Sequence, residues 1–307
     1  VFVPGGTPLN AVRVTTRRSS SNGNPVNWLL GATLGLNAVE ISESATATLL
    51  PELPGAIGGT GSVSITGSAS VDSYNSTLGP YDPANSGDDG DVVADGNVSI
   101  GGSAFVNGDV RGETVSTSGG GSVSGTVSPI RRSIEYPSVD TSQVAVLNDN
   151  GSLPPIEKGG KTSSPLDQQR NFRLSGGVVY EIPPGTYYFN DLRLSGQSTL
   201  SVSGQTIIYL TGDLDTSGGD VVNSTENPNN LSVLMTGGDV KLNASIDWYG
   251  LLYAPDSSVR LSGSGDIYGA IIGTNVDVGG TGDIHFDTSL TVSDVVDGIA
   301  RRSAIVR

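Results

Sequence analysis

The residues best suited to chemistry lie near the C-terminal end, in the segment DIHFD at 283–287. His285 is the only histidine of the chain, and Asp283 and Asp287 stand two positions to either side of it. An imidazole between carboxylates is typical of a metal site or of a proton-transfer site, because both groups offer ligand atoms and histidine titrates near neutral pH. The alternative is that this segment is one coil of a repeat and His285 an outward position in it.

The composition leaves few enzyme classes open. One histidine and no cysteine leave very little for a Ser-His-Asp or Cys-His site, and no disulfide or Cys-ligated metal can form. The motifs of nucleophile elbows, zinc proteases and P-loops do not occur. We therefore expect a protein that is not an enzyme and has no cofactor, calcium excepted.

The charge balance limits the partners. The formal net charge of -15 makes nucleic acid an unsuitable partner, because phosphate binding requires basic patches. Cations or a basic surface suit an acidic chain better.

No segment approaches the roughly 18 apolar residues of a membrane span, and the most apolar one, at 28–36, is too short. Because the chain opens with VFVPGG, we expect a processed chain whose targeting segment has been removed.

Repeats decide the expected fold. Residues 239–254 (DVKLNASIDWYGLLYA) align with 258–273 (SVRLSGSGDIYGAIIG) at an offset of 19, and a third copy follows at 275–286. Residues 97–110 align with 114–127 at an offset of 17. Short V-x-V strands separated by Gly and Asn turns cannot bury their apolar side alone, whereas stacked coils bury a continuous core. The sequence predicts an all-β chain folded as a right-handed parallel β-helix, a β-solenoid.

We expect five segments, assigned from the period and its interruptions. They are an N-terminal strand-rich capping segment at 1–55, coils at 56–128, an irregular Pro-rich connection at 129–173, further coils at 174–292 and a tail at 293–307. The two runs supply roughly ten coils, about 4.8 Å apart. The connection either packs on the solenoid surface or links two separate lobes.

Two parts of the chain resemble known families. Residues 10–49, with NAVRVTTRR, a Gly/Asn-Pro turn, an apolar segment and VEISESATATL, resemble TadE/TadG-like pilus-assembly proteins. Residues 185–214 and 248–273 resemble the β-helical domains of PilX-like bacterial surface proteins, and the repeats are similar to those of bactofilins, which polymerise end to end. The resemblance implies an extracellular or cell-surface structural protein of a bacterium, attached to the membrane only through an N-terminal anchor that this chain lacks.

Alternation along the strands predicts an outward aromatic ladder. If Ile267 points to the core, then Tyr268 points outward, and His285 takes the same place one coil later. This outward column is unusually apolar for a solvated surface, so the N-terminal segment or a partner subunit should cover it. We prefer cover from within the chain. The expected ladder or interface residues are Tyr249, Leu251, Tyr253, Tyr268, Ile272 and His285.

Acidic residues form two calcium candidates. Asp247, Asp266 and Asp283 recur at the coil period, and each carboxylate could instead accept N–H groups of its own turn. The second candidate is the loop at 81–97, which overlaps the turn-rich insert at 75–91 and does not fit EF-hand spacing. Its expected ligands are Asp82, Asp88, Asp89, Asp91 and Asp95.

A charged column offers the main alternative function. Lys241, Arg260 and Asp277 occupy the centres of three matching V-x-V strands and should face outward. Polysaccharide lyases with the parallel β-helix fold use such patches, although a surface charge ladder explains the residues more simply. We expect a non-enzymatic structural protein of a pilus-like or filament-like surface assembly, which pairs with itself or with other pilus or envelope proteins. The alternative is a carbohydrate-binding adhesin or a lyase, with a polysaccharide as partner.

Overall fold

The computed structural model describes residues 11–24, 41–48, 53–134 and 136–290. They belong to two compact units, Val1–Pro51 and Glu52–Arg307. Strands dominate both units, and the helices of the described residues are single 3₁₀ turns. None of these helices has the length and apolar character needed to span a membrane.

The N-terminal unit contains one antiparallel hairpin. Strand β1 (Ala11–Arg18) pairs with β2 (Ile41–Thr48), and the 3₁₀ turn η1 (Ser20–Asn22) follows β1. Both strands lie where sequence alternation places them. The apolar segment at 28–36 falls outside the described residues, and the capping role of this unit stays a prediction.

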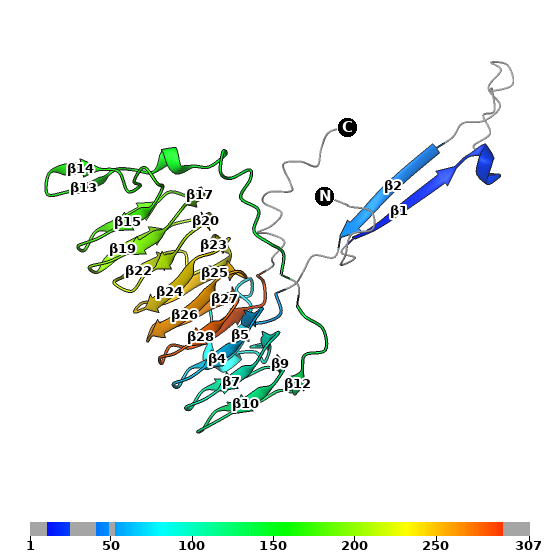
Figure 1. Ribbon diagram of the computed structural model, residues 1–307, viewed down its shortest axis with the longest axis horizontal. Helices are drawn as coiled ribbons and strands as arrows, with labels where there is room; N and C mark the ends of the chain where they lie inside the picture. Colours follow the sequence, from blue (N-terminus) through cyan, green and yellow to red (C-terminus); the bar gives the residue numbers. More distant parts are fainter. Residues whose placement is uncertain (1–10, 25–40, 49–52, 135, 291–307) are drawn as a thin grey trace, which may run out of the picture. The chain divides into compact units, whose positions relative to one another are not determined.

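The second unit is a parallel β-helix, as the repeats predict (Figure 1). Its first sheet takes one strand from each coil, nine in all, and every pair is parallel. In spatial order they are β10 (Val115–Thr117), β7 (Val98–Ile100), β4 (Val63–Ile65), β28 (Val276–Val278), β26 (Ser258–Gly263), β24 (Asp239–Ala244), β21 (Leu214–Asp215), β18 (Leu192–Leu194) and β15 (Phe172–Leu174).

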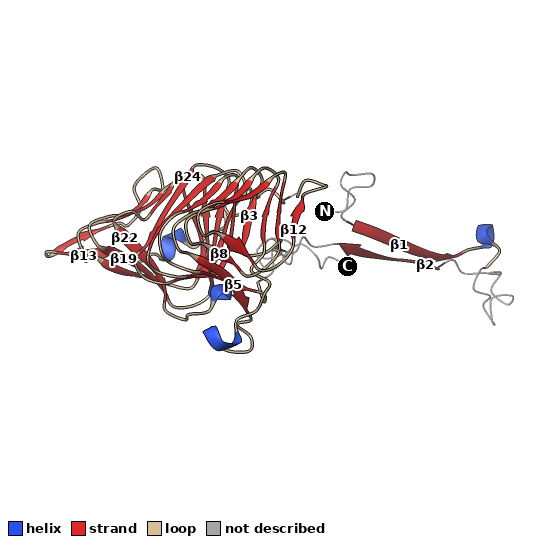
Figure 2. Cartoon of the chain, turned by 90° about the horizontal axis from the view of Figure 1, so that it is seen from below, coloured by secondary structure: helices blue, strands red, loops and turns tan. Residues whose placement is uncertain are grey.

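A second sheet of 13 strands faces the first (Figure 2). Its main row is β11 (Ser122–Val123), β8 (Phe105–Val106), β5 (Ser70–Tyr74), β29 (Ile284–Asp287), β27 (Ile267–Gly273), β25 (Trp248–Ala254), β23 (Leu231–Met235), β20 (Thr206–Leu210) and β17 (Gly185–Phe189). A side row of β3 (Ile57–Gly59), β6 (Val92–Ala94), β9 (Val110–Gly112) and β12 (Val127–Pro129) starts from the second half of β27. A third, shorter sheet contains β16 (Val179–Ile182), β19 (Ser198–Val202) and β22 (Gly219–Asn223).

The V-x-V pattern explains the core. In β7 the outer valine and isoleucine are fully buried and the serine between them is half-buried, and β26 repeats this alternation with an exposed arginine. Successive side chains of a strand point to opposite faces, so every coil sends the same pair of aliphatic groups inward. In-register stacking then joins these pairs into one apolar column along the solenoid.

The order in which the coils stack differs from their order in the chain. The last coil of the C-terminal run lies against the first strands of the N-terminal run, with Val276 opposite Val63 and Ile284 opposite Val71. Strand β3 supplies the third side of that last coil, because its Ile57 pairs with Ile271 of β27. The chain thus enters and leaves the solenoid at this seam, and the two runs form one continuous stack.

The Pro-rich connection crosses the outside of this stack. In Figure 1 it is the green segment that runs from β12 along the side of the solenoid to the hairpin of β13 (Ile156–Lys158) and β14 (Lys161–Ser163). The Tyr253 hydroxyl donates to the Pro137 carbonyl at 2.5 Å on the way. The connection therefore packs on the solenoid surface, and the two-lobe alternative is wrong.

The connection also covers the far end of the stack. The 3₁₀ turn η4 (Asn150–Ser152) lies beside the terminal strand β17, where Asn150 both donates to the Tyr188 carbonyl and accepts from its N–H. Asp149 bonds Thr186 in the same two directions. These contacts satisfy backbone groups that an unpaired parallel strand would leave open.

Candidate functional site at the seam

The aromatic ladder ends at the seam. Tyr249, Tyr268 and His285 are paired in register on β25, β27 and β29, and the two tyrosine rings stack at 4.4 Å between centroids. The next position in the column, on β5 of the other run, is Asp72. His285 is therefore the rung at which an aromatic column meets an acidic side chain.

His285 and Asp72 form a buried pair across the seam. The Nδ1 atom of His285 lies 2.6 Å from Oδ1 of Asp72, and the two side chains are 4% and 12% exposed. The Tyr81 hydroxyl donates to the other carboxylate oxygen of Asp72 at 2.7 Å. Hydrogen bonds on both oxygens compensate the desolvation of this carboxylate.

The insert at 75–91 covers the ladder. The Tyr81 ring packs on the His285 ring with centroids 3.8 Å apart and meets Tyr268 edge to face at 5.7 Å. Tyr74, at the end of β5, makes edge contacts with both Tyr81 and Tyr268. Further along β25, Tyr253 is covered by Tyr136 of the connection. In the described part of the chain, segments of the solenoid unit itself thus cover the predicted apolar column. Its members Leu251 and Ile272 are fully buried.

Burial keeps the phenols of this cluster protonated. It raises the pKa of Tyr249 to about 12, with the Asp247 carboxylate adding to the effect. Burial likewise raises the pKa values of Tyr268, Tyr81 and Tyr74 well above the usual 10. The Tyr74 hydroxyl is buried without a hydrogen-bond partner. The site therefore offers neutral donors around a carboxylate and an imidazole.

The aspartates at the ladder base are satisfied by neighbouring coils. Asp247 accepts the N–H of Asp266 at 3.0 Å, Asp266 that of Asp283 at 2.8 Å, and Asp283 that of Ser70 at 2.6 Å. The alternative in which each carboxylate accepts N–H groups of its own turn is therefore modified, because the donor N–H comes from the next coil of the stack. One bond per coil holds the turns in register and offsets part of the repulsion between stacked carboxylates.

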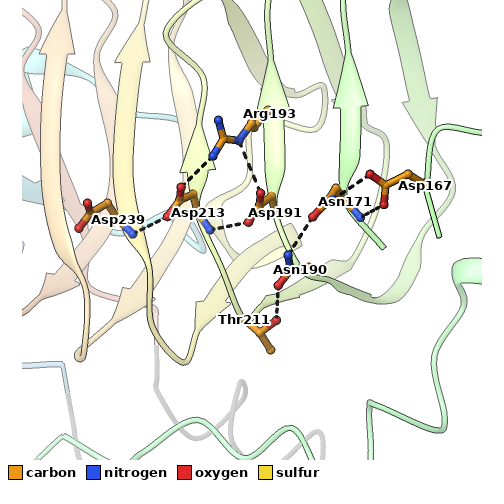
Figure 3. Close-up of polar contacts among 8 residues, drawn as sticks. All are labelled: Asp167, Asn171, Asn190, Asp191, Arg193, Thr211, Asp213 and Asp239. Atoms are coloured by element: carbon orange, nitrogen blue, oxygen red, sulfur yellow. Dashed lines mark hydrogen bonds and ion pairs between the residues drawn. The ribbon is translucent and has the colours of Figure 1, made fainter. Parts of the chain in front are cut away.

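The same device recurs elsewhere on the solenoid. Figure 3 shows Asp191, Asp213 and Asp239 linked by two such bonds of 3.1 Å, with Arg193 bridging the first two carboxylates. Asn171, Asn190 and Thr211 form a parallel polar row beside them. Aspartate at this turn position is thus a repeated structural element of the coils.

The predicted calcium loop is organised differently. Asp82 caps the 3₁₀ turn η3 (Pro83–Asn85), Asp91 accepts the Asp109 N–H, and Asp95 accepts the Ile134 N–H. Asp88 and Asp89 are exposed. Within the described residues, the group of three metal-ligating side chains brought together is Asp266, Asp283 and His285, whose ligand atoms lie within 4.8 Å of one another.

The charged column lies on the outer face of the first sheet. Lys241, Arg260 and Asp277 are paired in register there, and Arg260 reaches Asp277 at 3.4 Å. The column continues to Asp215, Arg193 and Arg173 beyond Lys241. A shallow depression beside Arg173 and Arg193 is lined by serines of the same turns. Opposite charges along the column are therefore interspersed.

The end of the N-terminal run is the second feature of functional interest. Val110 of β9 is fully buried, whereas Val127, its partner one coil further on β12, is 51% exposed. Val115 and Val123 are likewise less buried than Val98 and Val106 one coil before them. Within the described part of the solenoid unit no further strand pairs with β10, β11 and β12, so this end presents core side chains and the open edges of three strands.

Comparisons with known proteins identify one domain. Residues 188–292 match the family model described as "Domain of unknown function (DUF7305)". The comparisons with curated proteins and with solved structures give no match. The matched segment includes Tyr249, Tyr268 and His285, and it excludes Asp72 and Tyr81. The family description names no activity.

Proposed function

We propose that this chain is a non-enzymatic structural protein of a bacterial surface assembly of the pilus-like or filament-like kind, extracellular or held at the cell surface. The observation that carries the proposal is the uncapped coil end, where Val127 is 51% exposed while Val110 one coil inward is fully buried. A core section and open strand edges of this type are a template for pairing with another chain. The resemblance of residues 10–49 to TadE/TadG-like proteins supports the location.

The seam supplies an internal precedent for such pairing. There, strands β28 and β29 lie on β4 and β5 without a direct chain connection, in full register. Coil edges of this protein therefore recognise one another through backbone hydrogen bonds and aliphatic columns, to which side-chain contacts such as the His285–Asp72 pair are added at the seam. We infer that the uncapped end accepts the uncapped end of a second copy, because the connection covers the opposite end of the stack. This contact uses the same edge on both copies, so it gives a dimer with antiparallel strands across the interface, and this dimer is the building unit of the proposed assembly.

The test removes one outward-facing donor of the open edge. Beside β10, the Thr114 carbonyl accepts the Val98 N–H and the Ser118 N–H donates to the Ile100 carbonyl, both in the preceding coil. Because backbone groups alternate in direction along a strand, the N–H of Thr117 points away from that coil. Thr117→Pro deletes that outward N–H, and Thr117→Val is the matched control that keeps it. Light scattering and negative-stain microscopy should show association of the native protein and of the control, with association weakened in Thr117→Pro. A native protein that is monomeric under all ionic conditions would refute the assembly.

The charged outer column favours a second candidate function, binding of an acidic polysaccharide. Arg260 is 72% exposed, and Lys241 beside it is exposed as well. Such a row can bind uronate carboxylates, with cleavage as the extension to a lyase. Glycan-array binding, or the absorbance of unsaturated products from polyuronates, tests it. The expected result is that Lys241→Ala or Arg260→Ala loses the glycan binding or the product absorbance. If the native protein neither binds nor cleaves any polysaccharide tested, this candidate function is wrong.

A further inference from the structure

The metal-ligating side chains at the seam form a more specific arrangement than an acidic cluster. Asp266, Asp283 and His285 bring two carboxylates and one imidazole within 4.8 Å of one another. The His285 ring is 4% exposed, and its Nε2 atom points toward Asp266, 4.0 Å from Oδ2. That separation is too long for a hydrogen bond, so Nε2 has no hydrogen-bond partner among the described residues.

Asp72 fixes the orientation of this imidazole. Because Asp72 lies 2.6 Å from Nδ1, it holds the Nδ1–H tautomer and leaves the Nε2 lone pair free on the side of Asp266. A carboxylate that accepts the second ring N–H is the usual support of a metal-ligating histidine. The Tyr81 hydroxyl bond and ring contact hold Asp72 and His285 in place.

The carboxylates are also poised for a cation. One oxygen of Asp266 accepts the N–H of Asp283, and one oxygen of Asp283 accepts that of Ser70. Each carboxylate thus keeps its other oxygen for a ligand. Burial raises the pKa of Asp283, and the nearby Asp266 and Asp72 carboxylates add to this. Among the described residues, His285 is the basic side chain that lies beside the Asp266 and Asp283 carboxylates.

We propose that Asp266, Asp283 and His285 bind one divalent first-row transition-metal ion, with Asp72 as the residue that positions His285. One imidazole with two carboxylates suits Zn²⁺ and its neighbours, whereas Ca²⁺ and Mg²⁺ prefer oxygen ligands alone. Ligand atoms around tetrahedral zinc lie about 3.3 Å apart, so side-chain movements of roughly 1 Å complete the site. The ion would strengthen the seam, because its ligands belong to one run of coils and Asp72 to the other.

The test titrates the chelator-treated full chain with Zn²⁺ and with Co²⁺. We expect one equivalent of Zn²⁺ by calorimetry, and visible Co²⁺ absorption bands typical of nitrogen and oxygen ligands. His285→Gln and Asp283→Asn should lose this binding, and Asp72→Asn should weaken it about 10- to 100-fold. Asp247→Asn is the matched control, because Asp247 belongs to the same ladder one coil before the site and should leave binding unchanged.

Circular dichroism establishes that each variant is folded before it is titrated. If His285→Gln does not fold, Asp283→Asn carries the test, since its amide oxygen can still accept the Ser70 N–H. Absence of Zn²⁺ binding in the native chain would overturn the proposal. Equal Zn²⁺ affinity in Asp283→Asn and Asp247→Asn would also overturn it. The same holds if the native chain binds Ca²⁺ but neither Zn²⁺ nor Co²⁺.

Discussion

At the scale of single residues, His285 and Asp72 form a buried polar contact between the two runs of coils. The two residues are 213 positions apart in the chain, and their side chains are nevertheless in direct contact. Tyr81 closes the pair from above with a hydrogen bond and a ring contact. Tyr81 therefore contributes both to the cover of the ladder and to the hydrogen bonding of the Asp72 carboxylate.

Substitution of Tyr81 separates these two contributions. Tyr81→Phe removes the hydrogen bond to Asp72 and keeps the ring, so the free energy of unfolding should fall by about 1–2 kcal/mol. Tyr81→Ala also removes the ring from His285 and Tyr268, and the loss should reach roughly 3–4 kcal/mol. Urea denaturation measures both. Equal losses in the two variants would show that the ring contacts contribute nothing.

The Asp283 carboxyl should make the stability of the fold depend on pH. Its pKa in the folded protein is raised above 3.8, chiefly by burial. The protonated form is thus the one favoured by folding, and its stabilising contribution is present below pH 3.8 and lost as the pH rises through the folded value. In metal-free buffer, Asp283→Asn should therefore gain stability relative to the native chain between about pH 4 and pH 7. Thermal melts of the native chain and of Asp283→Asn across this interval measure the gain, and melts of equal temperature at every pH would contradict it.

The residues at the site differ in how far the sequence predicts them. The period alone places Tyr249, Tyr268 and His285 in one column, because equal offsets put equal positions above one another. Asp72 and Tyr81 carry no such signal. The alignment of 62–71 with 97–106 relates Asp72 to Asn107 of its own run, and nothing in it indicates which coil of the other run lies on top.

At the scale of elements, the coils require glycine where neighbouring backbones approach closely. Gly269 sits in the middle of β27 with φ +142°, opposite Gly250 of β25. A Cβ atom on Gly269 would lie 1.8 Å from the Gly250 carbonyl oxygen. The backbone conformation and the contact both exclude a side chain.

Gly269→Ala should therefore lower the free energy of unfolding by roughly 2–4 kcal/mol, the sum of backbone strain and overpacking. Gly237→Ala is the matched control, because nothing lies within 4 Å of its Cβ position and its φ is not positive. Chemical denaturation of both variants checks the difference. If the two substitutions have the same effect, the close approach of β25 and β27 is not a constraint.

At the scale of the whole molecule, the two runs should stay together after the connection is cut. Val146 and Leu147 are 80% and 66% exposed in that connection, which makes the segment a suitable protease site. The seam pairs β28 with β4, β29 with β5 and β27 with β3, so it does not depend on the connection. A chain nicked there should elute as one species in native gel filtration and as two fragments in denaturant. Separation in native buffer would show that the seam is weak.

This stacking order could not be predicted from the sequence. Periodicity specifies coils and their internal register, and it is the same for every order in which coils of equal shape are stacked. The prolines of the connection indicate where the period stops, without indicating that the chain then returns to the opposite end. The fold class and the columns that hold Asp266, Asp283 and His285 were therefore within reach of the sequence, whereas the seam and the positions of Asp72 and Tyr81 in it were not.

The chain joins the solenoid in the middle of the stack, at the seam, and this affects how the protein is synthesised. Strand β3 emerges from the ribosome early, but its partner β27 follows more than 200 residues later, since Ile57 pairs with Ile271. At about 5–20 residues per second, that edge waits roughly 10–40 s for its permanent neighbour. During this interval the nascent first run has two unpaired edges, and each can join a neighbouring nascent chain. We expect the yield of folded protein to depend on the elongation rate and on how densely ribosomes load the message, two quantities that leave the finished structure unchanged.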